Sequence, residues 1–280
     1  KEIKISDSEI YEKKLTNDES YHVCHTMIKI IYHNLFCWIV NKINETMYID
    51  NYHKFIGLLD IFGFEVFHNN NFEQLCINYA NECLQQQFNR YIFKNEQEIY
   101  NQEKIDWKHI SFPDNKNCLD LFEDYPIGIL SKIDEECLFP SGNDMSLFDK
   151  IYKLSLENDL LKITKKDKPL QKFTINHYPG KVKYDVIGFC NKNKDRLNNY
   201  AVRCLLKCNN IIFNNFDVNL LKELSTLASP SICKQFQTQL NELLKIIETT
   251  SLYYIRCLKP NDKNISDNFE EELIINQLKY

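Results

Sequence analysis

Three residues, Asp60, Gly63 and Glu65, have the types and the spacing that phosphate chemistry requires. An acid at the end of a buried strand can hold a water molecule of a Mg²⁺ ion. A glycine three residues later lets its backbone N–H approach a phosphate oxygen, because no Cβ intervenes. Glu65 adds a second acid that can pair with a basic residue and hold the turn closed. The same D-x-x-G spacing also occurs where an ordinary strand ends in a glycine turn, so both interpretations stay open.

The composition indicates a folded, soluble protein. The chain has 280 residues, enough for one large domain or two ordinary ones, and 44% of them are hydrophobic. That hydrophobic share excludes a disordered chain, and the frequent charges argue against a membrane protein. The net charge of −5 gives no overall attraction to polyanions. We therefore expect no nucleic-acid partner and no direct membrane insertion.

Cysteine and glycine spacing limits the kinds of site. The eleven cysteines include no C-x-x-C pair, so we expect buried thiols in a reducing cytosol rather than a zinc site. The first ten residues lack the apolar core of a signal peptide, so the sequons at Asn44 and Asn264 are interpreted as chance matches. The six glycines form neither G-x-x-x-x-G-K-[ST] nor G-x-G-x-x-G, so a complete phosphate-binding loop is absent from this sequence.

The elements that position the three residues follow from apolar periodicity. Residues 55–67 form a continuous apolar run with glycine turns, which predicts a buried strand ending at Asp60. A helix of about eight turns is predicted from Asn71 to about Tyr100. Its start carries Asn71 and Gln74 at the spacing of a capping box.

Other segments give weaker or shorter patterns. Residues 1–20 are weakly patterned, and a long helix with a broad buried stripe is predicted from Tyr21. Further predictions are two short helices at 127–137 and 143–155 around an apolar tip, an exposed lysine-rich loop at 161–172, a β-hairpin at 173–186, helices at 200–213 and 231–249, a strand at 251–258, and the start of a helix from Phe269.

Five longer segments resemble the myosin motor domain in sequence, order and spacing. They are LLDIFGFEVF (58–67), NNFEQLCINYANECLQQQFN (70–89), FKNEQEIY (93–100), IGILSKIDEECLFP (127–140) and YIRCLKPN (254–261). The resemblance extends from about Tyr21 to the last residue. It implies a mixed α/β, predominantly helical fold that is part of a P-loop NTPase-type, myosin- or kinesin-like motor, with a long relay helix and a few strands of an incomplete central sheet.

The resemblance also implies a division of the chain. Residues 1–20 are a lead-in and 21–280 a partial motor domain. Within it the expected parts are the switch II strand and turn (55–67), the relay helix and loop (71–110), the actin-binding helix-loop-helix (126–155), a basic surface loop (156–172), and the hairpin, helices and sheet strand leading to the reactive-thiol helix (173–280). The phosphate loop and switch I are expected upstream of residue 1.

Individual roles follow from the resemblance. It assigns Asp60 to the Mg²⁺ shell through water, Gly63 to the γ-phosphate, and Glu65 to a switch I arginine outside this chain. Ile61 and Phe62 join Asp60 and Gly63 as nucleotide-binding residues. The expected relay residues are Phe72 and the relay-loop Trp107. The expected actin-binding residues are Pro126, Ile127, Lys132, Leu138, Phe139, Pro140, Lys165 and Lys166.

Some positions depart from the family pattern. Lys132 stands where the family usually has an apolar residue, Cys83 replaces a customary basic residue, and Gln87 replaces an aromatic one. Residues 214–231 lie where the family carries its second actin loop, and Lys222 is their only base. We therefore expect no strong electrostatic actin tether in that segment.

The function implied is an actin-based, ATP-driven cytoskeletal motor, a myosin heavy chain head located in the cytoplasm on the actin cytoskeleton. The intact protein would be an actin-activated Mg-ATPase, with ATP and Mg²⁺ bound mainly outside these residues. Partners would be actin filaments and light chains or calmodulin-like proteins on a lever arm. Residues 1–280 alone are expected to be inactive and prone to aggregate.

The alternative function is a non-hydrolysing actin-binding or scaffold protein with a degenerate myosin fold. The intact DIFGFE segment argues against this alternative. Myosin class, cargo, direction and coiled-coil dimerisation stay open.

Overall fold

The computed structural model describes residues 2–4, 10–12, 14–48, 54–106, 114–139, 141–194, 199–208, 231–255 and 257–278. Internal contacts divide the chain into two units. The first contains Lys1–Asp60 and Lys194–Ser231, and the second contains Ile61–Asn193 and Ile232–Tyr280. Asp60 is therefore the last residue of one segment of the first unit, whereas Gly63 and Glu65 belong to the second.

The first unit is dominated by one long helix. Strands β1 (Glu2–Lys4) and β2 (Ile10–Glu12) pair antiparallel, and α1 (Asn17–Met47) and α8 (Asn199–Leu206) follow. The backbone N–H of Glu19 donates to Thr16 Oγ1 at 3.2 Å, and the Thr16 N–H donates to Glu19 Oε2 at 2.9 Å. This capping box starts α1 inside the predicted lead-in, four residues before Tyr21.

The predicted long helix is confirmed, and its predicted buried stripe is present only in part. Val23, Met27, Ile31, Leu35 and Trp38 are half-buried, and the buried positions are Thr26, Ile30 and Asn34. Other large apolar side chains of the helix are exposed, namely Tyr21, Ile28, Tyr32, Phe36, Ile39, Ile43 and Met47. Apolar periodicity predicts a helix without specifying what covers it. Glu19–Met47 is also long and apolar enough to cross a membrane, a property of length and composition that core helices of soluble proteins share.

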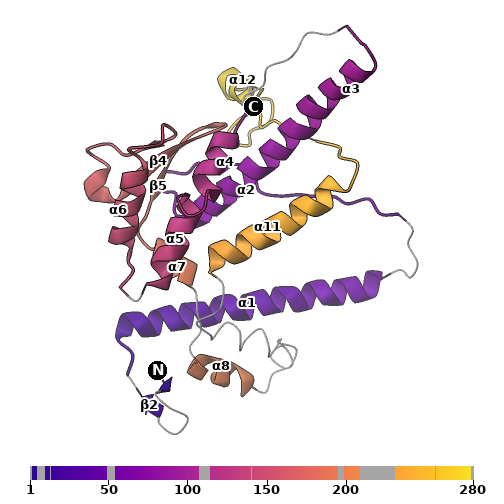
Figure 1. The fold of residues 1–280 in the computed structure, drawn as a ribbon. Coiled ribbons are helices and arrows are strands. Elements are labelled where there is room, and N and C mark those ends of the chain that lie inside the picture. The colour runs from indigo at the N-terminus through magenta and orange to yellow at the C-terminus, as the bar shows by residue number, and fades with distance from the viewer. Residues whose placement is uncertain are drawn as a thin grey trace. The chain divides into compact units, whose positions relative to one another are not determined.

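The second unit is built on a long continuous helical segment (Figure 1). It consists of α2 (Phe72–Phe88), a π-helical segment η1 (Asn89–Asn95) and α3 (Glu96–Gln102). At its start the Asn71 N–H donates to Gln74 Oε1 at 3.0 Å. The predicted long helix is thus present, with a π-helical turn that apolar spacing did not predict.

The remaining elements of the second unit surround α2. The predicted hairpin is confirmed as β4 and β5, whose register pairs Phe173 with Tyr184 and Ile175 with Val182. Gly180 follows the turn with a φ of +144°, a conformation that favours glycine. The elements are α4 (Lys116–Glu123), α5 (Ile129–Leu138), α6 (Asp144–Leu154), β3 (Leu161–Lys162), η2 (Lys168–Leu170), β4 (Lys172–His177), β5 (Gly180–Asp185), α7 (Phe189–Lys194), α11 (Ile232–Glu248) and α12 (Glu271–Leu278).

One apolar core joins these elements. Helix α2 contacts α4, α11 and β5, while α5 contacts α4, α6 and α11. The fully buried side chains that fill the space between them include Leu75, Tyr79, Phe122, Ile133, Phe148, Phe173, Tyr184 and Phe189. The strands form one three-stranded antiparallel sheet in the order β3-β4-β5. The second unit is therefore mostly helical with a small sheet, and its core holds the start of α2 in place.

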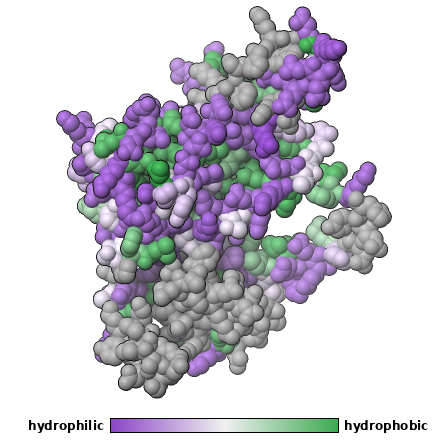
Figure 2. Space-filling view, viewed as in Figure 1, coloured by the Kyte–Doolittle hydropathy of each residue, from purple (hydrophilic) through white to green (hydrophobic). Residues whose placement is uncertain are grey.

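Two predicted strands are wrong for the described residues. Residues 55–67 have no regular secondary structure, and Leu58 is 94% exposed. Residues 251–255 and 257–258 are likewise irregular, and Ile255 is 88% exposed. A strand needs a hydrogen-bonded neighbour, and no described residue pairs with either segment. Figure 2 shows hydrophobic residues among hydrophilic ones on one face of the molecule.

The lysine-rich segment is more ordered than predicted. Residues 161–172 contain β3 and the short helix η2 rather than a simple loop. Buried Asp167 accepts hydrogen bonds from Lys183 Nζ at 2.7 Å and Thr164 Oγ1 at 2.6 Å, which anchor the segment. Lys165 and Lys166 are exposed, as predicted. The predicted helix at 200–213 is present to Leu206, and residues 209–213 lie outside the described part of the chain.

Candidate functional site

The turn that contains Glu65 is fastened to α2 by one buried amide. Asn78 Oδ1 accepts the backbone N–H of Glu65 at 2.8 Å, and Asn78 Nδ2 donates to the Glu65 carbonyl at 2.8 Å. The Glu65 carboxylate accepts from Gln74 Nε2 at 3.3 Å. Asn78 is fully buried, so this two-sided contact holds the backbone of the turn on the helix.

Gly63 and Phe62 form the outer part of the same turn. Asn81 Nδ2 donates to the Phe62 carbonyl at 3.3 Å and to the Ile77 carbonyl at 2.9 Å. Phe62 is exposed. A Cβ added at Gly63 would meet nothing within 4 Å. The turn therefore offers open space at the glycine where the sequence predicts an approaching phosphate.

The described residues do not form a complete Mg²⁺–nucleotide site. Asp60 is exposed and supplies one carboxylate, whereas Mg²⁺ takes six oxygen ligands including waters and phosphates. Ile61 and Phe62 are also exposed, and the sequence holds no phosphate-loop motif. These residues therefore cannot hold the ion and nucleotide by themselves.

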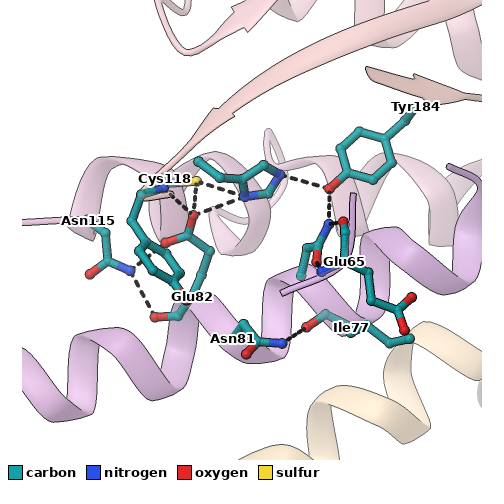
Figure 3. Close-up of polar contacts among 10 residues, drawn as sticks. Glu65, Ile77, Asn81, Glu82, Asn115, Cys118 and Tyr184 are labelled. Atoms are coloured by element: carbon teal, nitrogen blue, oxygen red, sulfur yellow. Dashed lines mark hydrogen bonds and ion pairs between the residues drawn. The ribbon is translucent and has the colours of Figure 1, made fainter. Parts of the chain in front are cut away.

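A buried polar cluster continues from Asn78 into the core (Figure 3). Asn78 Nδ2 lies 2.8 Å from the Tyr184 hydroxyl, which lies 2.8 Å from His177 Nε2. His177 Nδ1 lies 2.9 Å from Glu82 Oε1. Sequence reasoning missed these contacts, although Asn78 and Glu82 are polar residues one turn apart on an otherwise apolar helix face.

Glu82 is the far end of the cluster and accepts several donors. The Tyr178 N–H donates to Oε1 at 3.1 Å, the Cys118 thiol donates to the same atom at 3.2 Å, and Asn115 Nδ2 donates to Oε2. Burial, reinforced by the Glu82 charge, raises the pKa of the Cys118 thiol and keeps it protonated. The side chains come from α2, β4 and α4, and from the residue that precedes α4.

Glu82, Cys118 and His177 also have the donor types of a metal site. Their ligand atoms lie within 4.8 Å of one another, and all three residues are buried. However, Glu82 Oε1 already accepts hydrogen bonds from three groups. The cluster is satisfied by hydrogen bonds between protein groups, so its geometry does not require a cation.

The predicted helix-loop-helix is present as α5 and α6, and its tip faces solvent. Leu138 is 72% and Phe139 52% exposed. Within the same unit, Lys150 Nζ of α6 lies 5.2 Å from the centre of the Phe139 ring. Pro126 and Ile127 are also exposed, and Pro140 lies outside the described residues. Lys132 is half-buried and pairs with Glu135 at 3.5 Å. These surface residues are available to a partner.

An internal ion pair braces this helix pair. Buried Glu136 on α5 accepts from Lys150 Nζ on α6 at 2.8 Å, from the Asn143 N–H at 3.3 Å, and from the Ser146 hydroxyl. Gly142 closes the turn, where a Cβ would collide with the Glu136 carbonyl. These contacts tie the end of α5 to the start of α6 beside the tip.

The contacts of Glu136 with Lys150, Asn143 and Ser146 predict that the stability of the fold depends on pH. Burial acts to raise the pKa of Glu136, but the hydrogen bonds from Lys150, Ser146 and Asn143 outweigh it and lower that pKa below the ordinary 4.5. A lowered folded-state pKa stabilises the fold above the ordinary value, and this contribution disappears as the pH falls through the folded-state pKa. We expect Glu136→Gln to melt below the wild type at pH 7, and the difference to vanish on acidification below pH 4.5. Thermal unfolding of both proteins between pH 7 and pH 3 measures this; a constant gap would contradict it.

The structure describes only one of the two predicted relay residues. Phe72 is buried at the start of α2, with its ring 5.7 Å from that of Phe189. Trp107 lies outside the described residues.

Comparison with known proteins places the whole chain in one family. The family model for the myosin head (motor domain) matches residues 1–280. The chain belongs to the myosin head family. It is 40% identical over 275 residues to Myosin-2 of Arabidopsis thaliana, covering 95% of this chain and 22% of that protein. It is 38% identical over 296 residues to Myosin-4 of Saccharomyces cerevisiae, covering 96% and 20%. For Myosin-J heavy chain of Dictyostelium discoideum the identity is 36% over 302 residues, covering 98% and 13%.

The chain spans about a fifth or less of the length of these myosins.

The structure describes the surroundings of Cys83, one of the positions that the sequence analysis singled out. Cys83 on α2 is buried, and its Sγ lies 3.7 Å from Glu123 Oε1. Burial, with the nearby Glu123 charge, raises the pKa of Cys83 to about 12. Glu123 also accepts from the Tyr79 hydroxyl at 2.6 Å. Two neutral donors, the Tyr79 hydroxyl and the Cys83 thiol, therefore contact this carboxylate.

Proposed function

We propose that this chain is the switch II, relay and lower actin-binding part of an actin-based, ATP-driven myosin motor. The match to the myosin head over residues 1–280, with DIFGFE intact at 60–65, carries this proposal. In the intact protein ATP hydrolysis would be coupled to actin binding and release. The protein would act in the cytoplasm on the actin cytoskeleton, with light chains or calmodulin-like proteins on its lever arm.

The proposed nucleotide role is electrostatic and positional. Asp60 would hold a water of the Mg²⁺ shell, Gly63 would donate its N–H to the terminal phosphate, and Glu65 would pair with an arginine outside this chain. Asn78 and Asn81 tie this turn to α2. A small movement of the turn would therefore move the start of a long rigid helix, whose far end moves further.

The proposed actin surface is the exposed tip of α5 and α6 with the neighbouring lysines. Exposed apolar side chains such as Ile127, Leu138 and Phe139 favour a covering partner. Lys165 and Lys166 would add attraction to an acidic filament. Pro126, Lys132 and Pro140 belong to the same proposed surface.

Actin co-sedimentation of the natural full-length protein, with and without Mg-ATP, tests the proposal. Binding that ATP releases would support a nucleotide-coupled motor. Binding indifferent to ATP would favour the non-hydrolysing scaffold, and absence of binding would contradict the assignment of the tip.

A substitution at the tip should separate binding from folding. We expect Leu138→Asp to weaken actin binding about tenfold, because a charge replaces an apolar contact at the centre of the surface. The melting temperature should stay unchanged, since Leu138 is exposed. The matched control is Leu156→Asp, a leucine of similar exposure that follows α6 outside the tip. Equal affinities of the two variants in co-sedimentation would refute the tip as a contact.

A further inference from the structure

The hydrogen bonds that leave the Glu65 turn form one continuous chain through the core (Figure 3). The chain runs from the Glu65 backbone to Asn78 on α2, crosses to Tyr184 on β5 and His177 on β4, and returns to Glu82 on α2. All four side chains are at least nine-tenths buried. A buried chain of this kind is sensitive to the loss of any one member.

The direction of each hydrogen bond in this chain can be assigned by counting donors. Asn78 Oδ1 accepts the Glu65 N–H, so both hydrogens of Nδ2 are available for the Glu65 carbonyl and the Tyr184 oxygen. The Tyr184 oxygen thus receives a hydrogen from Asn78 and can give its own to His177 Nε2. His177 then carries its hydrogen on Nδ1 and donates it to Glu82 Oε1.

The Glu82 end of the chain is fixed in three ways. The Tyr178 N–H, the Cys118 thiol and the Asn115 amide all donate to its carboxylate. Asn115 and Cys118 lie at and just inside the start of α4, the helix that leads to α5 and the exposed tip. The Glu65 end has one buried side chain, Asn78, holding its backbone. The row of hydrogen bonds therefore connects the Glu65 turn to the well-anchored Glu82 carboxylate and restrains the position of the turn.

We propose that Tyr184 and His177 are positioning residues for ATP hydrolysis. They hold the Asn78 amide in the orientation that clamps the Glu65 backbone, and so keep Gly63 where its N–H can meet a phosphate. This inference rests on the proposed function of the turn. Both residues are buried in the core, so the proposed role is positioning rather than contact with the nucleotide. Their loss should therefore slow the step that needs a closed turn while leaving ATP affinity to the residues outside this chain.

The test compares two Tyr→Phe variants of the full-length protein. Tyr184→Phe interrupts the chain, whereas Tyr79→Phe removes an equally buried hydroxyl whose partner, Glu123, has no contact with Asn78 or Glu65 among the described residues. Both variants should show similar small decreases in melting temperature. We expect Tyr184→Phe to lower kcat for ATP hydrolysis about tenfold with KM within about twofold, the effect of one lost net hydrogen bond. Tyr79→Phe should keep kcat within about twofold of the wild type.

The outcomes separate the inference from the proposed function. Equal effects of the two variants on kcat, in a wild type that hydrolyses ATP, would overturn the positioning role alone. A wild type without ATP hydrolysis would overturn the proposed function and this inference with it. If Tyr184→Phe does not fold, His177→Gln interrupts the same chain of hydrogen bonds at its next member and leaves the Asn78 contact with the Glu65 backbone in place. Its kcat must then fall at unchanged KM.

Discussion

We expect Gly63→Ala to lower ATP hydrolysis by the full-length protein about 100-fold or more without changing its melting temperature. The proposed role of Gly63 requires a phosphate oxygen to approach its N–H closely, and a methyl group beside that N–H would obstruct the approach. Removing a single donor of this kind typically costs a factor of about 100 to 1,000 in rate. In the structure an added Cβ meets no atom within 4 Å, so the fold itself should tolerate alanine.

Gly57→Ala is the matched control for this prediction. Gly57 lies six residues earlier in the same apolar segment, and a Cβ there would make an ordinary contact of 3.9 Å with the ring of Phe55. We expect its hydrolysis rate to stay within about twofold of the wild type. The measurements are steady-state ATPase and thermal unfolding of both variants. A Gly63→Ala protein with near-normal hydrolysis would exclude Gly63 from phosphate contact, and equal losses in both variants would indicate a general intolerance of the segment.

The helices could be predicted from the sequence because their determinants are local. Apolar residues at helical spacing located α2, α5, α6 and α11 within a few residues. The Gln74 side chain at the start of α2 accepts the Asn71 N–H, as its spacing predicted. The π-helical turn at Asn89–Asn95 was not predicted, because apolar spacing does not specify a change of hydrogen-bond register within a helix.

The strands were predicted less well for a physical reason. The hairpin at 172–185 pairs with itself across a two-residue turn, so its partner is close in sequence. The apolar runs at 55–67 and 251–258 carry strand-like composition, but a strand also requires a neighbour that composition does not identify. Among the described residues neither run has one.

The site was predicted in part. The resemblance assigns the Glu65 carboxylate to an arginine outside this chain, which stays a prediction, whereas the structure shows the Glu65 backbone held by Asn78. Asn78 and Tyr184 are 106 positions apart in the chain. No local sequence pattern connects residues that are so far apart in the chain. The polar residues Asn78 and Glu82 on the otherwise apolar face of α2 did indicate that the core contains polar contacts.

We expect Glu82→Ala to be the most destabilising single substitution in this cluster. It would leave His177, the Tyr178 N–H, the Cys118 thiol and Asn115 without their acceptor in a fully buried position. A buried donor left without its acceptor typically costs about 1–3 kcal/mol, so we expect the loss of several acceptor contacts to lower the free energy of unfolding by about 3–5 kcal/mol in total. For a domain of this size that corresponds to a melting temperature about 10 °C lower. Chemical and thermal denaturation of the full-length protein measure both quantities.

Glu82→Gln distinguishes the need for an acceptor from the need for a charge. Its remaining oxygen can still accept from the three donors at Oε1. Asn115 Nδ2 would lose its acceptor at Oε2 but keep the backbone carbonyl of residue 82, to which it donates at 2.8 Å. We therefore expect Glu82→Gln to lose only about 1 kcal/mol. A loss as large as that of Glu82→Ala would contradict the hydrogen-bond account, because it would mean that the cluster depends on the negative charge itself, as the donor set Glu82, Cys118 and His177 would if it held a cation.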